Sequence, residues 1–247
     1  MTVLRARDNP RVKRWAKLVR DPRFRRSEGR FLVEGPKLVA AALEAKWKIE
    51  ALLVSECALA GPWDKYRPVI VSEAVFNSVV DSEAPQGVAA ELAMPSPALP
   101  KEGSAVFLEG VQDPGNVGTI LRSAAAFGVR SAVLDRACAD PWSPKVLRAG
   151  AGAHFALSVA QAEGLKEALQ LYRGKTACTV PRGGTPIGEA DLAGDLGWIF
   201  GAEGQGVSSV LRDRSQLKIS IPCAIESLNV AAAAAICFYV SRPGAGS

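Results

Sequence analysis

Long apolar runs are absent from this 247-residue sequence. A transmembrane helix needs roughly 20 consecutive apolar residues, and no stretch of that length occurs, so no membrane span is expected. The first residues also lack the apolar core of a secretory signal peptide. They are rich in arginine, as transit peptides are, but acidic residues interrupt them and serine is scarce. We therefore expect a cytoplasmic protein.

Cysteine and histidine are few. The five cysteines form no C-x-x-C pair, so neither a disulfide framework nor a zinc site is predicted, and no other metal is expected. They are Cys57, Cys138, Cys178, Cys223 and Cys237. The single histidine, His154, leads into a predicted strand, and we interpret it as structural rather than as a catalytic base. The G-x-G-x-x-G fingerprint and the Walker lysine are missing too, which opposes a nucleotide-dependent oxidoreductase on a conventional Rossmann fold.

Positive charge is concentrated at the start of the chain. Residues 1–30 contain eleven lysines and arginines against three acidic residues, whereas the whole chain has a net charge of only +5. A basic segment on a near-neutral body is typical of a protein that binds a polyanion by neutralising phosphates. A solvated helical face is the alternative, but three acids cannot pair with eleven cations. The predicted nucleic-acid contacts are Arg11, Lys13, Arg14, Arg23, Arg25 and Arg26.

Alternating strands and helices predict two α/β domains joined by a proline-rich linker. The first, residues 1–93, begins with a helix that has apolar residues on one face and basic residues on the other. Residues 94–103 contain three prolines and form the linker. In the second domain, residues 104–243, short apolar strands alternate with helical stretches, which predicts a parallel sheet covered on both faces. The predicted strands are 105–108, 132–134, 177–180, 198–200 and 217–221.

Three polar segments follow predicted strands of the second domain and are unusual for a plain core. The first runs from residue 108 to residue 122. A strand ends at Gly110, Asn116 is placed to cap the next helix, and Arg122 follows within two turns. The Asn and Arg side chains can converge near the helix start, where backbone amides and a guanidinium form an anion site. By itself, this segment favours a simple N-cap and a surface arginine.

The second and third segments lie nearer the C-terminus. Residues 198–207 form an apolar strand that enters a loop with three glycines around Glu203. Glycine permits positive φ angles and close approach of the backbone to a ligand, although a tight turn is the alternative. In residues 219–236, a strand leads into a loop where Ser227 or Asn229 caps a helix that begins with five consecutive alanines after Val230. Because alanine side chains are small, this helix allows another helix or chain to approach closely. The alternative is that it is simply a well-capped core helix.

Together, the three segments resemble the ordered motifs of the SpoU/TrmH family of RNA ribose methyltransferases, in the SPOUT superfamily. The matching patterns are Asn-x-Gly-x-x-x-Arg from Asn116, Phe-Gly-Ala-Glu-Gly-x-Gly from Phe200, and Ile-Pro…Glu-Ser-Leu-Asn-Val-Ala-x-Ala from Ile221. Residues 140–155 are similar to the family's stretch between its first two motifs. Three motifs in the right order, each after a strand, are far more specific than any one of them.

The N-terminal residues 31–39 and 86–89 resemble the ribosomal-protein-like substrate-binding domain of the family's ribosomal RNA members, so the resemblance spans about residues 9–240. It implies a parallel-sheet α/β SPOUT domain whose C-terminal segment is threaded into a trefoil knot, preceded by a small α/β ribosomal-protein-like domain. It also implies a homodimer that binds S-adenosyl-L-methionine and RNA.

The resemblance also assigns site residues. Those that match cofactor-binding positions are Gly201, Glu203, Gly204, Ile221, Leu228 and Asn229. Those that match catalytic positions are Arg122, Asn116, Glu203, Ser227 and Asn229. A guanidinium is a poor base at neutral pH, so we favour Arg122 as a stabiliser of the developing alkoxide and as a phosphate clamp. The expected reaction is 2′-O-methylation of ribosomal RNA; transfer RNA methylation and a non-catalytic RNA-binding assembly factor on the same fold are the alternatives.

Overall fold

The computed structural model describes residues 2–59, 61–96, 99–225 and 227–242. The chain divides into two compact units. The first comprises Met1–Pro95 and Trp142–Phe155, and the second comprises Ser96–Pro141 and Ala156–Ser247. Each unit has its own sheet.

The segment Trp142–Phe155 packs with the first unit, although the sequence places it in the second domain. The ring centroids of Trp142 and Phe31 are 4.7 Å apart, and those of Phe155 and Trp47 are 5.2 Å apart. Contact between these large rings explains why the segment packs with the first unit, because aromatic side chains bury much apolar area where they meet. The single histidine of the chain, His154, belongs to this segment; its side chain is buried beside Trp142.

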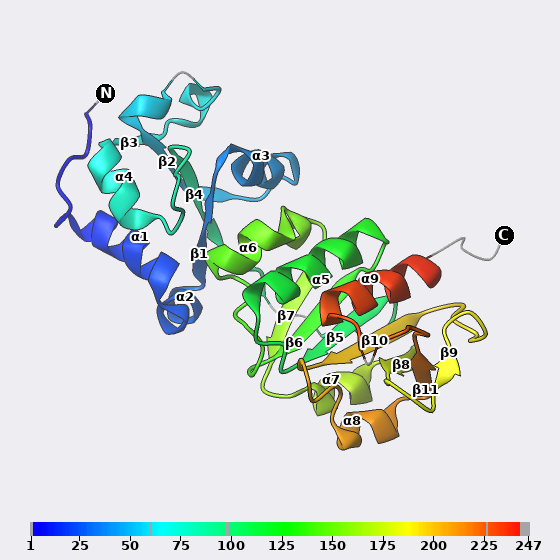
Figure 1. Cartoon of the computed structure of the whole chain (residues 1–247). Coiled ribbons are helices and arrows are strands. Elements are labelled where there is room, and N and C mark those ends of the chain that lie inside the picture. Colours follow the sequence, from blue (N-terminus) through cyan, green and yellow to red (C-terminus); the bar gives the residue numbers. More distant parts are fainter. Residues whose placement is uncertain (1, 60, 97–98, 226, 243–247) are drawn as a thin grey trace. The chain divides into compact units, whose positions relative to one another are not determined.

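The first unit is built on a four-stranded mixed sheet with the strand order β1-β4-β2-β3 (Figure 1). β4 pairs antiparallel with β1 and β2, and β3 pairs parallel with β2. The strands are β1 (Arg30–Glu34), β2 (Ile49–Ser55), β3 (Val69–Val71) and β4 (Val88–Ala93). The α-helices are α1 (Pro10–Arg20), α2 (Pro22–Glu28), α3 (Pro36–Glu44), α4 (Glu73–Val79) and α6 (Pro144–Gly150). Short 3₁₀ helices lie at Glu56–Ala58, Asp64–Tyr66 and Ala153–Phe155.

The basic N-terminal segment is part of this unit's core and not a separate arm. Val12, Trp15 and Leu18 on one face of α1 are buried in a cluster with side chains from α4 and the sheet. The predicted helix with an apolar face and a basic face is therefore confirmed. Its removal would expose the core of the unit, because Trp15 and Leu18 are almost fully covered.

The second unit is built on a seven-stranded sheet with the order β7-β6-β5-β10-β8-β11-β9. Every neighbouring pair in it is parallel, as the alternation of short apolar strands and helices predicts. The strands are β5 (Ala105–Glu109), β6 (Ser131–Asp135), β7 (Ser158–Ala162), β8 (Lys175–Thr179), β9 (Thr185–Pro186), β10 (Leu196–Gly201) and β11 (Leu217–Ser220).

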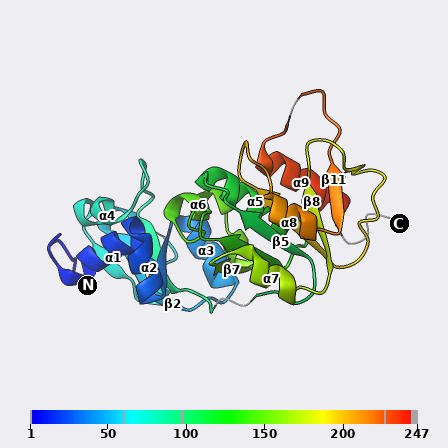
Figure 2. The same cartoon turned by 90° about the horizontal axis from the view of Figure 1, so that it is seen from below.

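Helices cover both faces of this sheet. They are α5 (Pro114–Ala126), α7 (Leu165–Leu171), α8 (Ser209–Arg214) and α9 (Val230–Val240). α5 and α9 lie on one face and α7 and α8 on the other (Figure 1), and the second face is turned toward the viewer in Figure 2. Leu165 and Leu211 pack with Phe107 on the α7 side, and the Phe200 and Phe238 rings meet on the α9 side. In the described parts of the chain, no helix is both long and apolar enough to cross a membrane.

The carboxyl ends of β5, β10, β8 and β11 lie side by side at one edge of the sheet, because these neighbours are parallel. After β5 the chain continues to β6 and β7 on one side, and the later strands lie on the other. Open α/β sheets bind ligands at such a switch point, outside the carboxyl ends of the strands. The three polar segments leave β5, β10 and β11 at this edge.

Candidate active site

The loop after β10 owes its shape to glycine. Gly204 and Gly206 have φ angles of +80° and +68°, a conformation that residues with a side chain rarely adopt. A Cβ atom on Gly201 would lie 2.0 Å from the Gly206 carbonyl oxygen, because Ala202 and Gly206 pair across the turn. The loop therefore folds back on itself and leaves backbone groups, rather than side chains, along its edge.

The third segment ends in a helix cap. The Asn229 Oδ1 atom accepts hydrogen bonds from the backbone N–H groups of Ala231, at 2.9 Å, and Ala232, at 3.2 Å. Of the two candidate caps, Asn229 is therefore the one used. Its Nδ2 atom donates to Asn116 Oδ1 at 3.0 Å, which ties the third segment to the first. Glu226 of the same motif lies outside the described residues.

The cap of α5 is Asp113, and the prediction that Asn116 caps this helix is wrong. Asp113 Oδ1 accepts a hydrogen bond from the Asn116 backbone N–H at 2.7 Å, and Pro114 occupies the first helical position. Because Asp113 serves as the cap, the Asn116 amide is available for other contacts, and its Nδ2 atom donates to Glu203 Oε1 at 2.6 Å. Asn229, Asn116 and Glu203 thus form a hydrogen-bonded chain, the motif triad, that joins all three segments.

Two carboxylates that sequence reasoning missed hold the neighbouring loops. Glu109, the last residue of β5, accepts a hydrogen bond from the Ser208 backbone N–H at 2.7 Å. Asp135, the last residue of β6, accepts one from the Gly110 backbone N–H at 3.1 Å. An acid at the carboxyl end of each strand is the signal that could have identified both.

A pocket of about 460 Å³ lies between these loops. Its lining includes all six residues predicted to bind the cofactor, together with Ser227. The sequence did not single out the loop after β8, which contributes Val180 and Pro181, nor Arg212 of α8. The pair Gly183-Gly184 in the loop after β8 is a signal that could have marked that loop, whereas nothing in the pattern around Arg212 marks it. The remaining lining residues are Thr179, Ala202, Gln205, Gly206, Val207, Cys223, Val230 and Ala233.

Arg122 lies outside this pocket. It is exposed on α5, six residues after Asn116. Six residues are about one and two-thirds helical turns, so the two side chains leave the helix in different directions. Asn116 bonds to Glu203 and Asn229, and no described hydrogen bond joins Arg122 to the motif triad, so the convergence of Asn116 and Arg122 stays a prediction.

The basic residues of the first unit have different environments. Arg25 is buried, and its Nη1 atom donates to the carbonyl oxygens of Leu18, at 2.6 Å, and Val19, at 2.8 Å. The prediction that Arg25 contacts nucleic acid is therefore corrected: it closes the C-terminal end of α1. Arg14 is half-buried and forms ion pairs with Glu28 and Glu91.

Four of the predicted contacts are exposed. They are Arg11, Lys13, Arg23 and Arg26, on α1 and α2. The Arg11 guanidinium lies 5.0 Å from the centroid of the Trp15 ring, which steadies it without neutralising it. We call these four residues the basic helix surface.

A parallel α/β sheet with a loop-lined pocket at its switch point defines a ligand-binding domain of the kind that serves nucleotide-like cofactors. Comparison with known families is more specific. Residues 103–239 match the model of the SpoU rRNA Methylase family, and residues 9–90 match an MRM3-like substrate binding domain. The chain belongs to the SpoU rRNA methylase family.

Relatives match along nearly the whole chain. The 23S rRNA (guanosine(2553)-2′-O)-methyltransferase RlmP of Bacillus subtilis is 33% identical, over 98% of this chain and all of its own length. The solved SpoU methyltransferase AviRb of Streptomyces viridochromogenes, in complex with AdoMet, is 26% identical, with a TM-score of 0.85 over 94% of this chain and 97% of its own. An AdoMet-bound rRNA methyltransferase from Sinorhizobium meliloti is 28% identical, with a TM-score of 0.85 over 97% of each chain.

Proposed function

We propose that this chain catalyses 2′-O-methylation of ribosomal RNA in the cytoplasm, with S-adenosyl-L-methionine as the methyl donor. The observation that carries the proposal is that one pocket, at the switch point of the sheet, gathers every residue predicted to bind the cofactor. Ribosomal RNA is favoured over transfer RNA because the B. subtilis relative, which aligns over its full length, is named for 23S rRNA. A non-catalytic assembly factor would have no need for the motif triad.

The pocket residues fit S-adenosyl-L-methionine. A volume of about 460 Å³ falls within the range of small-molecule sites. Ile221, Leu228 and Val230 supply apolar surface for a heterocycle, and the glycine loop supplies backbone polar groups. The lining contains one carboxylate, Glu203, and one guanidinium, Arg212, which suits a ligand that has both a sulfonium cation and a carboxylate.

Bound S-adenosyl-L-methionine supplies a methyl group made electrophilic by the adjacent sulfonium. The chain itself must hold the ribose hydroxyl in line with that methyl group and stabilise the charge that develops on its oxygen. Arg122 is exposed, and because a guanidinium is a poor base it suits the second task as a cation.

The motif triad is suited to positioning. Glu203 and Asn229 hold the two ends of the Asn116 amide, so its orientation is set before any substrate binds. Loops that are held in place beforehand lose less entropy when the reactants come together. Ser227 lines the same pocket, which supports a role for its hydroxyl in contacting the ribose or the donor.

RNA capture is assigned to the basic helix surface of the first unit. Arg11, Lys13, Arg23 and Arg26 are exposed cations on consecutive helices. Cations of this kind bind RNA through its phosphates, with an affinity that falls steeply as salt rises. This unit thus supplies affinity, and the pocket of the second unit supplies chemistry.

The trefoil knot and the homodimer of the family are also part of the proposal. Ala231 and Ala234 of α9 are buried, and α9 packs along α5. On the same helix, Ile236 is 37% exposed and Tyr239 is 53% exposed, which suits an interface with a second copy.

The dimer can be tested by sedimentation. The wild type should sediment as a dimer and Ile236→Glu as a monomer, with Lys166→Glu on α7 as the exposed control. A monomeric wild type would overturn the dimer.

Methyl transfer can be tested with donor labelled in its methyl group and with transcripts of 23S rRNA and of transfer RNA. The wild-type chain should label the ribosomal transcript only. Ala233→Phe, which fills the pocket from α9, should lose both labelling and donor binding. A wild type that binds no S-adenosyl-L-methionine in calorimetry would refute the enzymatic function and leave the assembly factor.

A further inference from the structure

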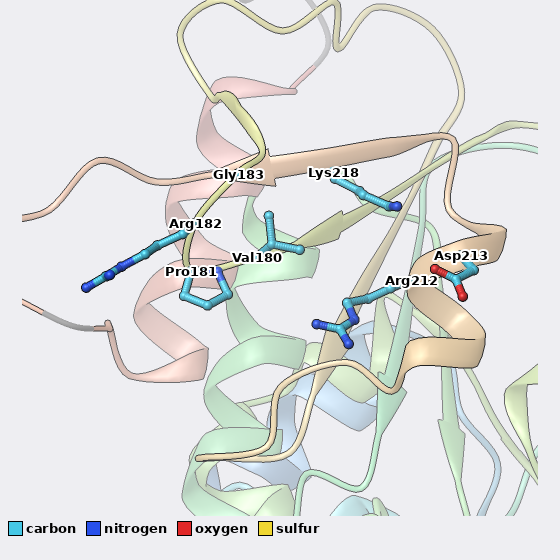
Figure 3. A pocket seen from close by; sticks show the side chains of 7 residues that line it. All are labelled: Val180, Pro181, Arg182, Gly183, Arg212, Asp213 and Lys218. Atoms are coloured by element: carbon cyan, nitrogen blue, oxygen red, sulfur yellow. The ribbon is translucent and has the colours of Figure 1, made fainter.

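A second hollow, of about 480 Å³, lies beside the cofactor pocket in the second unit (Figure 3). Three elements build it: the loop that follows β8, helix α8 and strand β11. Its lining residues are Val180, Pro181, Arg182, Gly183, Arg212, Asp213 and Lys218. Three cations therefore share this hollow with one carboxylate.

The charges of this hollow are not used inside the fold. Among the described residues, no ion pair includes Arg182, Arg212 or Lys218, and the Asp213 carboxylate makes none with them. All three cations are exposed. A net positive charge that is not neutralised by the protein itself is the electrostatic requirement of an anion site.

Two of the cations face the same space. Figure 3 shows Arg212 reaching from α8 toward Pro181 and Lys218 extending from β11 above it, whereas Arg182 points outward from the loop. Arg212 and Lys218 thus form the centre of the hollow, and Arg182 forms its rim.

We propose that Arg212 and Lys218, with Arg182 at the rim, bind a phosphate group of the substrate RNA next to the methyl-donor site. The two cavities share Val180, Pro181 and Arg212, so an anion held here lies beside the cofactor pocket. Arg182 and Lys218 line only this hollow and not the cofactor pocket, so they are free to contact an RNA phosphate while the donor is bound. This inference rests on the proposed function, because it takes RNA as the polyanion. The carboxylate of the donor is the alternative anion, and donor-binding measurements distinguish the two.

The test is the double variant Arg182→Gln/Lys218→Gln, which leaves the cofactor pocket lining unchanged. Its affinity for a fluorescent 23S rRNA transcript, measured by anisotropy over a range of salt, should fall about 5- to 10-fold. Each lost phosphate contact should reduce the slope of log K against log salt by about 0.7–0.9. Lys218→Arg should retain most of the affinity. Lys166→Gln, an exposed lysine on α7, is the matched control and should behave as the wild type.

Donor binding separates the outcomes. Calorimetry should give the same S-adenosyl-L-methionine affinity for the double variant and the wild type. Weaker donor binding with unchanged RNA affinity would assign the hollow to the donor carboxylate and overturn the inference, as would an unchanged salt slope. If the wild type transfers no methyl group but the double variant still binds RNA more weakly than the wild type, the proposed function is refuted and the RNA subsite stands.

Discussion

The two units of the chain arrange their polar residues in different ways. In the first unit, the functional candidates lie on the outer faces of α1 and α2, spread along the helices. In the second, they lie in loops at the carboxyl ends of parallel strands, where Asn116, Glu203 and Asn229 bond to one another. A helical face offers many separate charges, whereas strand ends bring distant parts of the chain to one point.

This difference separates affinity from chemistry. Phosphate contacts from spread cations add up and are each replaceable. Residues gathered at one pocket act together, so the loss of one disables the rest. Changes in the motif residues of the second unit should therefore cost rate, whereas changes on the helices of the first, like those at Arg182 and Lys218, should cost affinity in graded steps.

The largest effect is expected at Arg122. Arg122→Ala should lower kcat about 10²- to 10³-fold, because a cation that stabilises developing charge is lost. Donor affinity should change less than a few-fold, since Arg122 does not line the pocket. Single-turnover kinetics and calorimetry measure the two quantities. Equal loss of donor binding and turnover in a folded variant would contradict this role.

The basic helix surface should give the next largest effect. Replacing Arg11, Lys13, Arg23 and Arg26 together by glutamine should reduce the salt slope of RNA binding by about 3 and the affinity roughly 10- to 100-fold. At saturating RNA, the rate of methyl transfer should stay near that of the wild type. A fall in that rate at saturation would mean that the first unit also takes part in chemistry.

How far the sequence predicts these sites depends on how local the cause is. The glycines at 201, 204 and 206 predict the loop after β10, because the need for positive φ or close approach is a property of the backbone there. The cap of α5 is local too, but both Asp113 and Asn116 are good capping residues, and only the structure shows which one bonds.

Tertiary contacts are what the sequence does not predict. Arg25 and Arg26 are adjacent in the same basic stretch of sequence, yet Arg25 is buried and Arg26 is exposed. The aromatic contacts of Trp142–Phe155 likewise join segments that are distant in sequence, and the hollow brings the loop after β8 to α8 and β11, about thirty residues further on.

Arg25 and Arg26 make a matched pair that tests this distinction. Arg25→Met removes two buried hydrogen bonds to carbonyl oxygens and should lower the free energy of unfolding by about 1–3 kcal/mol. Arg26→Met should leave it nearly unchanged and weaken RNA binding slightly. Urea unfolding of the full chain measures the first and anisotropy the second. Equal stability of the two variants would show that Arg25 has no structural role.

The smallest effect concerns Glu34 in the first unit. Burial raises the pKa of its carboxyl group, and the Arg148 guanidinium, 3.9 Å away, lowers it less. The folded state therefore holds this proton more tightly than the unfolded state, so the free energy of unfolding falls as pH rises from the ordinary Glu pKa to the raised one. Glu34→Gln should remove that step. Identical pH profiles for variant and wild type, in urea unfolding between about pH 4 and pH 7, would contradict it.

The most direct test of the whole account is to locate the methyl group. Ribosomal RNA incubated with the wild-type chain and S-adenosyl-L-methionine should be digested to nucleosides and nuclease fragments and analysed by mass spectrometry. We expect one 2′-O-methylated nucleoside, in 23S rRNA, and none with Arg122→Ala. A methyl group on a base, or no methylated product from a chain that binds both donor and RNA, would contradict the assignment.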